Sequence, residues 1–358
     1  MLLYADSGNP NTETITVTAY DRAIDISNSA FITIKGLAIS EAKHENLYAN
    51  AVSNLVLTGN EFSRAGENGL VFNGVGTNVL VEKNSISHIN NNGVYIGAYQ
   101  NVTFRNNSIR DVGVLPNRGK SGDGQFTAFQ SFATQNTLIE NNVIDSVGYI
   151  GLSVFSNSII RQNLISNFCM TKSDGGGIYL WNGTQLPLHN IQIQSNIIQK
   201  GVGTFGPLSA TDYSGAHGVF LDDCVESVTM TDNTITDCHG LGIYLHAVNH
   251  VNLIRNTCFN NTVGQLILYN YDAPCLPRNN VLNQNILVAK TANQSVVGYI
   301  SGANDLGSFG QITQNYYARP FNDAFTIRSV YNRTIVNDLN LAQWQAQFGQ
   351  DGMSKNSP

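Results

Sequence analysis

The sequence predicts an all-β chain wound into a parallel solenoid, and three observations carry this prediction. A short run of alternating apolar residues followed by Asn-x-Ile recurs along the chain. A second alternating segment, which begins with glycine, lies between successive copies. The shortest units have about 21–24 residues, too few to bury their own apolar face, so the units are expected to stack into one continuous core.

The Asn-x-Ile segments place apolar residues at every second position before the asparagine, as Leu55 and Leu57 do. This period of two, rich in Val, Ile and Leu, is typical of strands. Stacking brings the asparagines into one column, where they are expected to hydrogen-bond to each other. Cys258 replaces the isoleucine of its copy and is predicted to be a core residue. The copies carry Asn60, Asn84, Asn107, Asn142, Asn163, Asn196, Asn233, Asn256, Asn285 and Asn315.

The glycine-started segments are the second kind of strand. Residues one and three positions after the glycine are apolar and are predicted to face inward, and residues two and four positions after it are predicted to face outward. Three such segments begin at Gly177, Gly218 and Gly242. Their predicted outward residues are Tyr179, Trp181, Phe220, Asp222, Tyr244 and His246.

Both ends of the solenoid depart from the repeat. Asn340, Gln343 and Gly349 mark a short helix whose apolar face is expected to cover the last coil. The predicted organisation is a β-helix over residues 1–337, a capping helix over 338–350 and a tail over 351–358. Strand-like residues 14–18 follow almost directly on the N-terminus, and an upstream cap or domain is expected to be missing from this chain.

Three turns between an Asn-x-Ile segment and the next glycine are longer than the rest, over residues 109–124, 165–177 and 198–218. All three leave the same corner of the coil. Because loops on a rigid scaffold often carry function, they are predicted to wall a groove beside the glycine-started strands.

Composition excludes several classes of protein. The 358 residues carry only 12% charged residues and a formal net charge of −6, which disfavours a nucleic-acid binder. No apolar run is long enough to span a membrane, and no signal peptide is visible. The five cysteines form no CxxC pair, so no structural zinc site is expected. Buried thiols are favoured over disulfides.

The asparagine column, the coil length and the Gly-Ile-Tyr-Leu strands resemble the right-handed parallel β-helix repeat family of the pectate-lyase-like superfamily, over residues 14–318. The resemblance implies a single-stranded right-handed parallel β-helix of about 10–11 coils. It also implies action on extracellular or periplasmic glycans, although the superfamily includes hydrolases, lyases, epimerases and noncatalytic adhesive proteins.

Candidate catalytic groups gather around the aromatic residues. Asp222 and Asp223 end one strand, and His246 is predicted to follow in the column of Asp222. Asp174 precedes its strand by three residues, and His217 directly precedes Gly218. An Asp-Asp pair followed by a histidine about one coil later resembles polygalacturonase-type hydrolases, but their Asn-Thr-Asp and Arg-Ile-Lys motifs are not found at matching positions.

Tyr179, Trp181, Phe220 and Tyr244 are candidates for stacking on sugar rings, although they could also simply stack on each other. Arg118, Lys120 and Lys172 are candidates for binding an anionic sugar, although they could also be solvated loop residues. The acids in turn could cap a strand or a turn.

Three functions remain open at this point. A glycoside hydrolase needs two carboxylates, which the acids named above could supply. A polysaccharide lyase or uronan epimerase needs a base beside a neutralised uronate, and Lys120, Lys172, Arg118 or His217 could serve. A noncatalytic carbohydrate-binding solenoid needs the aromatic residues alone. The expected partner is a polysaccharide or oligosaccharide; no cofactor is certain, and Ca²⁺ would accompany a lyase.

Overall fold

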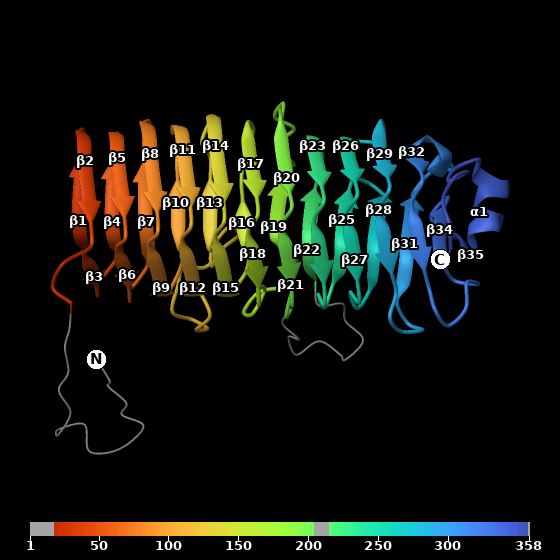
Figure 1. Cartoon of the computed structure of the whole chain (residues 1–358), viewed down its shortest axis with the longest axis horizontal. Helices are drawn as coiled ribbons and strands as arrows, with labels where there is room; N and C mark the ends of the chain where they lie inside the picture. The colour runs from red at the N-terminus through yellow and green to blue at the C-terminus, as the bar shows by residue number, and fades with distance from the viewer. Residues whose placement is uncertain (1–17, 204–214, 357–358) are drawn as a thin grey trace, which may run out of the picture.

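The structure, a computed structural model, describes residues 18–203 and 215–356. In these ranges the chain winds through three sheets that run side by side along one long axis (Figure 1). Consecutive coils pair in parallel, so that each strand lies beside its equivalents in the coils before and after it. This confirms the parallel β-helix, and the eleven strands in each of the two shorter sheets agree with the predicted 10–11 coils.

Sheet A contains the glycine-started strands and carries the candidate site. All its pairs are parallel except the last, β34 with β35. Its strands are β1 (Arg22–Ser27), β4 (Glu45–Asn50), β7 (Asn68–Asn73), β10 (Val94–Ile96), β13 (Phe129–Ser131), β16 (Leu152–Ser153), β19 (Gly175–Trp181), β22 (Ala216–Asp222), β25 (Leu241–His246), β28 (Gly264–Asn270), β31 (Ser295–Ser301), β34 (Ile327–Tyr331) and β35 (Ile335–Leu339).

Sheets B and C contain the two halves of the Asn-x-Ile segment. Sheet B is formed by β2 (Ala30–Lys35), β5 (Ser53–Thr58), β8 (Thr77–Glu82), β11 (Gln100–Arg105), β14 (Gln135–Glu140), β17 (Ser158–Arg161), β20 (Ile191–Gln194), β23 (Glu226–Thr231), β26 (Asn249–Ile254), β29 (Asn280–Asn283) and β32 (Gly310–Thr313). Sheet C is formed by β3 (Ala38–Ser40), β6 (Glu61–Ser63), β9 (Ser85–Ile89), β12 (Ser108–Val112), β15 (Val143–Val147), β18 (Leu164–Ser166), β21 (Ile197–Gln199), β24 (Thr234–Thr236), β27 (Thr257–Phe259), β30 (Ile286–Val288) and β33 (Tyr316–Ala318).

The recurring asparagines form a buried ladder at the corner between sheets B and C. Asn142 is representative: its Oδ1 accepts from the backbone N–H and the Nδ2 of Asn107, and its own Nδ2 donates to Asn163 Oδ1 and to Phe104 O. Each asparagine thus satisfies backbone groups that the corner would otherwise leave unpaired. The predicted column is confirmed from Asn60 to Asn315.

The interior is filled by the inward residues of all three sheets, and Cys258 is among these buried residues as predicted. At the C-terminal end, α1 (Leu341–Phe348) has the predicted capping box between Asn340 and Gln343 and ends at Gly349 in the left-handed conformation. Trp344 stacks on Tyr299 with ring centroids 4.5 Å apart, which closes the core. A short 3₁₀ helix, η2 (Leu306–Ser308), precedes β32.

The residues expected to form a C-terminal tail, described as far as 356, pack against the last coil. Asp351 is buried and accepts hydrogen bonds from Tyr317 Oη and Trp344 Nε1. Ser354 Oγ accepts from the backbone N–H of Asn315 and so ends the asparagine ladder. Beyond α1, the chain therefore contributes side chains to the cap.

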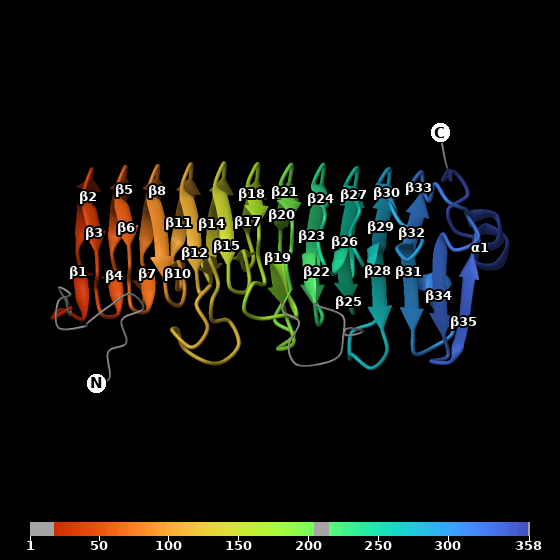
Figure 2. The ribbon, with the colours of Figure 1, turned by 90° about the horizontal axis from the view of Figure 1, so that it is seen from below.

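The long turns leave the corner between sheets C and A, and Figure 2 shows the orange loop after β12 projecting from this edge. One expected boundary is wrong: the strand after this loop is in register from Ala128, opposite Gly93, and not from Gly124. Strand-like residues 14–17 and much of the third long turn, 204–214, lie outside the described residues. Within the described residues, no helix is long and apolar enough to cross a membrane.

Candidate functional site

Three consecutive strands of sheet A, β19, β22 and β25, present the candidate site on their outward face. Tyr179 stands opposite Phe220 and Phe220 opposite Tyr244, which forms one column of side chains. In the next column Trp181 stands opposite Asp222. His246, 24 residues further along the chain, contacts Asp222 from the following coil. The predicted register of this face is confirmed.

Asp222 is fixed from two sides. Tyr179 Oη donates a hydrogen bond of 2.8 Å to Asp222 Oδ2, and His246 Nδ1 lies 2.7 Å from Asp222 Oδ1. The Asp222 side chain is only 14% exposed. These contacts on both oxygens set the orientation of the Asp222 side chain.

Asp223 faces the same groove because the backbone turns at this point. In a regular strand the next side chain would point to the opposite face. Asp223 and Cys224 instead have φ angles of 44° and 63°, in the left-handed region. Trp181 Nε1 donates to Asp223 Oδ2 at 3.1 Å, and His246 Nδ1 lies 3.4 Å from Asp223 Oδ1. Two carboxylates therefore flank one imidazole.

The carboxylates control the charge of His246. Burial alone would lower the pKa of His246, but the hydrogen bond to Asp222 and the charges of Asp222, Asp223 and Asp174 outweigh burial and raise it. The imidazolium form is therefore favoured to higher pH than in a free histidine.

Asp174 lies at the start of β19, in a loop that the glycine run Gly175–Gly177 allows to approach its neighbours closely. Tyr149 Oη donates to the carbonyl oxygen of Asp174 at 2.7 Å. Asp174 is exposed to solvent. Desolvation by the surrounding chain and the negative charge of Asp222 raise the pKa of Asp174, and nearby His246 opposes them.

A hollow of about 420 Å³ opens beside Asp174 and is lined by Gly122, Asp123, Tyr149, Lys172 and Ser173 as well. Lys172 Nζ donates to the carbonyl oxygen of Gly122 at 2.6 Å and lies over the ring of Phe126. Burial lowers the pKa of Lys172, and the charge of Asp123 opposes this. The first two long turns thus meet at the candidate site, as their common corner predicts.

Two predicted site residues are placed elsewhere than expected. Phe220 is 3% exposed because Tyr179, Tyr244 and His217 surround its ring, with centroids 5.1, 4.6 and 4.9 Å away. His217 is fully buried, its Nδ1 accepts from the backbone N–H of Leu241, and burial lowers its pKa to about 3. The predictions that Phe220 binds substrate and that His217 acts as an acid or base are therefore corrected: both side chains are buried among the neighbouring rings of the outward face.

Two predicted basic contacts do not line the hollow beside Asp174. Lys120 Nζ forms an ion pair of 2.6 Å with Glu67, five coils before Asp222. Arg118 is exposed in the same long turn. Of the three predicted basic residues, Lys172 is thus the one that lines the hollow beside Asp174.

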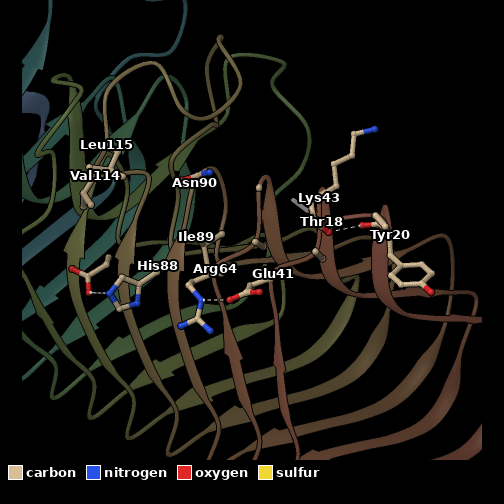
Figure 3. A pocket seen from close by; sticks show the side chains of 15 residues that line it. Thr18, Tyr20, Glu41, Lys43, Arg64, His88, Ile89, Asn90, Val114 and Leu115 are labelled. Atoms are coloured by element: carbon tan, nitrogen blue, oxygen red, sulfur yellow. Dashed lines mark hydrogen bonds and ion pairs between the residues drawn. The ribbon is translucent and has the colours of Figure 1, made fainter. Parts of the chain in front are cut away.

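A larger hollow of about 910 Å³ lies on the N-terminal coils, at the corner after sheet C (Figure 3). Its charges are already paired across neighbouring coils, Arg64 with Glu41 at 3.0 Å and His88 with Asp111 at 3.7 Å. The chemical groups therefore favour the groove around Asp222 over this hollow.

Sequence reasoning missed two features of the site. Tyr149 is 8% exposed and supports Asp174, but it precedes its strand with no recurring pattern that would single it out. Cys224 and Cys275 form a disulfide directly after the Asp222–Asp223 pair, against the expectation of buried thiols. Cys169, Cys238 and Cys258 do remain buried thiols.

In the part of the chain that the structure describes, one group of three side chains could hold a metal ion: Asp222, Asp223 and His246, whose ligand atoms all lie within 4.8 Å of one another. Two oxygens and one imidazole nitrogen suit a hard or intermediate divalent cation.

Comparison with known families and structures agrees with this architecture. A family described as "Right handed beta helix region" matches residues 22–198, and one described as "Periplasmic copper-binding protein (NosD)" matches residues 208–326. No curated protein sequence matches the chain.

Solved structures share the fold at low sequence identity. The A-module of the mannuronan C-5 epimerase AlgE4 of Azotobacter vinelandii is 14% identical, with a TM-score of 0.55 over 93% of this chain and 81% of that module. The tailspike protein of E. coli bacteriophage HK620, solved with a pentasaccharide, is 10% identical, with a TM-score of 0.51 over 85% of this chain and 68% of the tailspike.

Within the described part of this second match, residues 215–326, the side chains do not fit a site for the soft copper(I) ion, which prefers thiolate and thioether ligands. Met230, Cys238 and Cys258 are buried in the core, and Cys224 and Cys275 are joined to each other. His246 is left with two carboxylates as companions.

The coil-to-coil register, the buried asparagine ladder and the family match over residues 22–198 all indicate a parallel β-helix. The chain belongs to the right-handed parallel β-helix repeat proteins.

Proposed function

We propose that this protein is a glycoside hydrolase that binds a glycan along the outer face of sheet A and cleaves it between Asp174 and Asp222. The observation that supports this most is a pair of carboxyl groups in different environments, near enough for the charge of Asp222 to raise the pKa of Asp174. Asp174 has a raised pKa, and Asp222 accepts hydrogen bonds on both oxygens. Glycoside hydrolysis needs one protonated and one ionised carboxyl group across the scissile bond.

In this proposal Asp174 acts as the general acid and protonates the leaving glycosidic oxygen. Asp222 acts as the carboxylate on the other side of the sugar, as a base toward water or as a nucleophile. Tyr179 and His246 are positioning residues, because they hold Asp222 through its two oxygens. Asp223, held by Trp181, adds negative charge that favours the cationic character of the transition state.

The first test replaces each acid with its amide in the whole protein. Asp174→Asn and Asp222→Asn should each lower the rate of reducing-end formation by about 10²–10⁴-fold, the usual contribution of a positioned acid or base. Asp232→Asn is the matched control, because Asp232 is an exposed acid paired with Arg255 away from the groove. Unchanged denaturation midpoints would show that the fold is kept, and wild-type rates in Asp222→Asn would remove this residue from the site.

The second candidate is elimination or epimerisation on a uronate. Lys172, with its lowered pKa, is the observation in its favour, and Asp222, Asp223 and His246 could hold a Ca²⁺ ion. However, Asp123, Asp174, Asp222 and Asp223 would repel a uronate in the absence of a cation. A panel of neutral and uronate polysaccharides, with and without chelator, separates the reactions: reducing ends without ultraviolet absorbance indicate hydrolysis, and absorbance from a new C=C bond indicates elimination.

The third candidate, a noncatalytic carbohydrate-binding solenoid, is supported by the exposed Trp181 and by the partly exposed Tyr269, which packs against His246. This candidate predicts that the protein retains a glycan from the panel of polysaccharides but forms no product.

We also propose that the protein works outside the cytoplasm, in the periplasm or the extracellular space. The Cys224–Cys275 disulfide supports this, because disulfides persist in oxidising compartments, and polysaccharides of this kind are met there.

A further inference from the structure

An aromatic column leads away from the candidate site toward the N-terminus. The strand register places Phe132 opposite Phe155 and Phe155 opposite Trp181. The three residues therefore lie on consecutive coils, in the outward column that Asp222 continues. Phe132 and Trp181 are 42% and 48% exposed. The ring centroids of Phe132 and Phe155 are 6.3 Å apart. Phe132 and Phe155 take no part in the proposed catalysis.

Phe132 and Trp181 expose more of their rings than packing requires, whereas Phe155 is partly buried against the core. Apolar rings on a solenoid face can bury themselves against each other, as Phe220 does beneath Tyr179 and Tyr244. Phe132 remains 42% exposed although the ring of Tyr95 lies 5.8 Å from it, centroid to centroid. An open ring face beside a groove is suited to a flat apolar surface such as one side of a sugar ring.

The spacing of the column fits an extended chain. Neighbouring coils are about 4.8 Å apart, which is close to the length of one sugar ring in an extended glycan. A polar column runs beside the aromatic one: Gln130 stands opposite Ser153, and Tyr179 follows on the next coil. Side chains of this kind can hydrogen-bond to hydroxyl groups on the edge of a ring that stacks on Phe132 or Phe155.

The charge of this face indicates which sugars it accepts. The outward residues of β10, β13 and β16 and of the positions directly after them are Tyr95, Gly97, Gln130, Phe132, Ser153 and Phe155. None carries a charged side chain, and the charged residues that line the hollow beside Asp174 are Asp123, Asp174 itself and Lys172, whose Nζ donates to the carbonyl oxygen of Gly122. A uronate chain would find no basic residue on this column to pair with its carboxylates, whereas a neutral chain needs no such partner.

We propose that Phe132 and Phe155 are binding platforms for a neutral, extended oligosaccharide that runs parallel to the helix axis and enters the Asp222 site over Trp181. This inference rests on the proposed function for the direction of the chain and deepens it by naming the substrate class. It assigns to the protein a preference for long neutral chains, because a short substrate would occupy the region around Trp181 without reaching Phe132.

The test uses the full chain and compares Phe132→Ala/Phe155→Ala with Phe259→Ala. Phe259 is a matched control, 38% exposed on sheet C. The probes are neutral gluco-, xylo- and manno-oligosaccharides and oligouronates, each as disaccharides and hexasaccharides. Binding is followed by Trp181 fluorescence in an Asp222→Asn background, and turnover of the same probes is followed with Asp222 intact.

The double variant should bind neutral hexasaccharides at least tenfold more weakly, the order expected for two lost ring contacts, while disaccharide turnover stays as in the wild type. Phe259→Ala should match the wild type on both probes. Equal hexasaccharide affinity in both variants, or tighter binding of oligouronates than of neutral chains, would overturn the proposal.

The outcomes also separate this inference from the proposed hydrolase. If hexasaccharide binding depends on Phe132 and Phe155 but no probe is cleaved, the platforms stand and the hydrolase fails. If probes are cleaved and the double variant behaves as Phe259→Ala does, the hydrolase stands and the platforms fail.

Discussion

Asp174 shows how one carboxyl group takes its character from residues on other coils. Nothing in its own loop would keep it protonated. Desolvation and the charge of Asp222 raise its pKa, and the charge of His246 lowers it. The solenoid brings these groups together although up to two coils separate them in sequence.

A pH prediction follows for His246. As a general acid, Asp174 must be protonated, so kcat/KM should fall as pH rises through its raised pKa. His246→Gln removes a positive charge that lowers the pKa of Asp174, and this should move the alkaline limb of the kcat/KM profile to higher pH. A limb that stays in place, or moves to lower pH, in a variant with measurable activity would contradict the assignment of Asp174 as the acid.

A second residue-scale prediction concerns the asparagine ladder. Asn142→Ala removes four hydrogen bonds and takes away the partner of the buried backbone N–H of Asn107 and the side-chain donor to the carbonyl oxygen of Phe104. We expect the free energy of unfolding to fall by about 3–5 kcal/mol, since each unsatisfied buried group costs about 1–3 kcal/mol.

The control is Asn252→Ala, where a partly exposed side chain makes one weak bond of 3.4 Å to Thr229. It should change the free energy by about 1 kcal/mol or less. Urea denaturation of both variants makes the comparison, and equal losses would show that the ladder contributes no more than a surface amide.

Residues with a recurring local pattern could be predicted from the sequence, and residues defined by their neighbours could not. The asparagine column and the Trp181–Asp222–His246 face follow from period and spacing. The burial of Phe220 and His217 depends on how rings of adjacent coils fill the same space, which no single coil encodes. Ala128 starts its strand without the glycine on which the register prediction relied.

At the scale of elements, the disulfide is the tie that sequence spacing did not reveal. Cys224 follows β22, and Cys275 lies in the turn after β28, two coils later. The turn bends back along the stack to reach its partner, a path that is set by tertiary structure alone. The disulfide fixes the segment that directly follows Asp222 and Asp223.

Reducing this disulfide should destabilise the protein measurably. It joins residues 51 positions apart, and a chain-entropy estimate for such a loop is about 4 kcal/mol. Denaturation with and without reductant should show this loss in the wild type. Cys224→Ser/Cys275→Ser should already be less stable and should not respond to reductant; a wild type that is equally stable under both conditions would argue against the bond.

The cap at the other end of the chain was more predictable, because its signals are local. Asn340, Gln343 and Gly349 lie within one short helix, and each performs the expected capping role. The role of the residues after the helix could not be predicted from local sequence. Asp351 and Ser354 complete the last coil by accepting hydrogen bonds from Tyr317 and Asn315.

At the scale of the whole molecule, one long stack of equivalent coils carries the groove, and sheet A provides a straight face several coils long. The fold itself was predicted almost completely, since the repeat pattern is present in nearly every coil. The groove was predicted in outline only, because its walls are the long turns, and turns follow no period.

This repetition allows a prediction about whole coils. Asn84 and Asn107 are 23 residues apart and occupy the same place in successive coils. Deleting residues 84–106 should therefore join Asn107 to the ladder in place of Asn84 and leave a cooperatively folding protein. Deleting residues 84–95 would misalign every inward side chain at the junction and should prevent cooperative unfolding, as followed by circular dichroism during denaturation; equal behaviour of the two deletions would contradict the register.

The ladder also bears on how such a chain can change over generations. Every rung offers the same two faces to its neighbours, so a duplicated or lost segment is tolerated when it spans one full rung, and the corner after sheet C accepts added length without disturbing the rungs. Duplication of the DNA for one coil can thus lengthen the groove, and mutation of a single turn can alter its specificity. The two kinds of change are largely independent of each other.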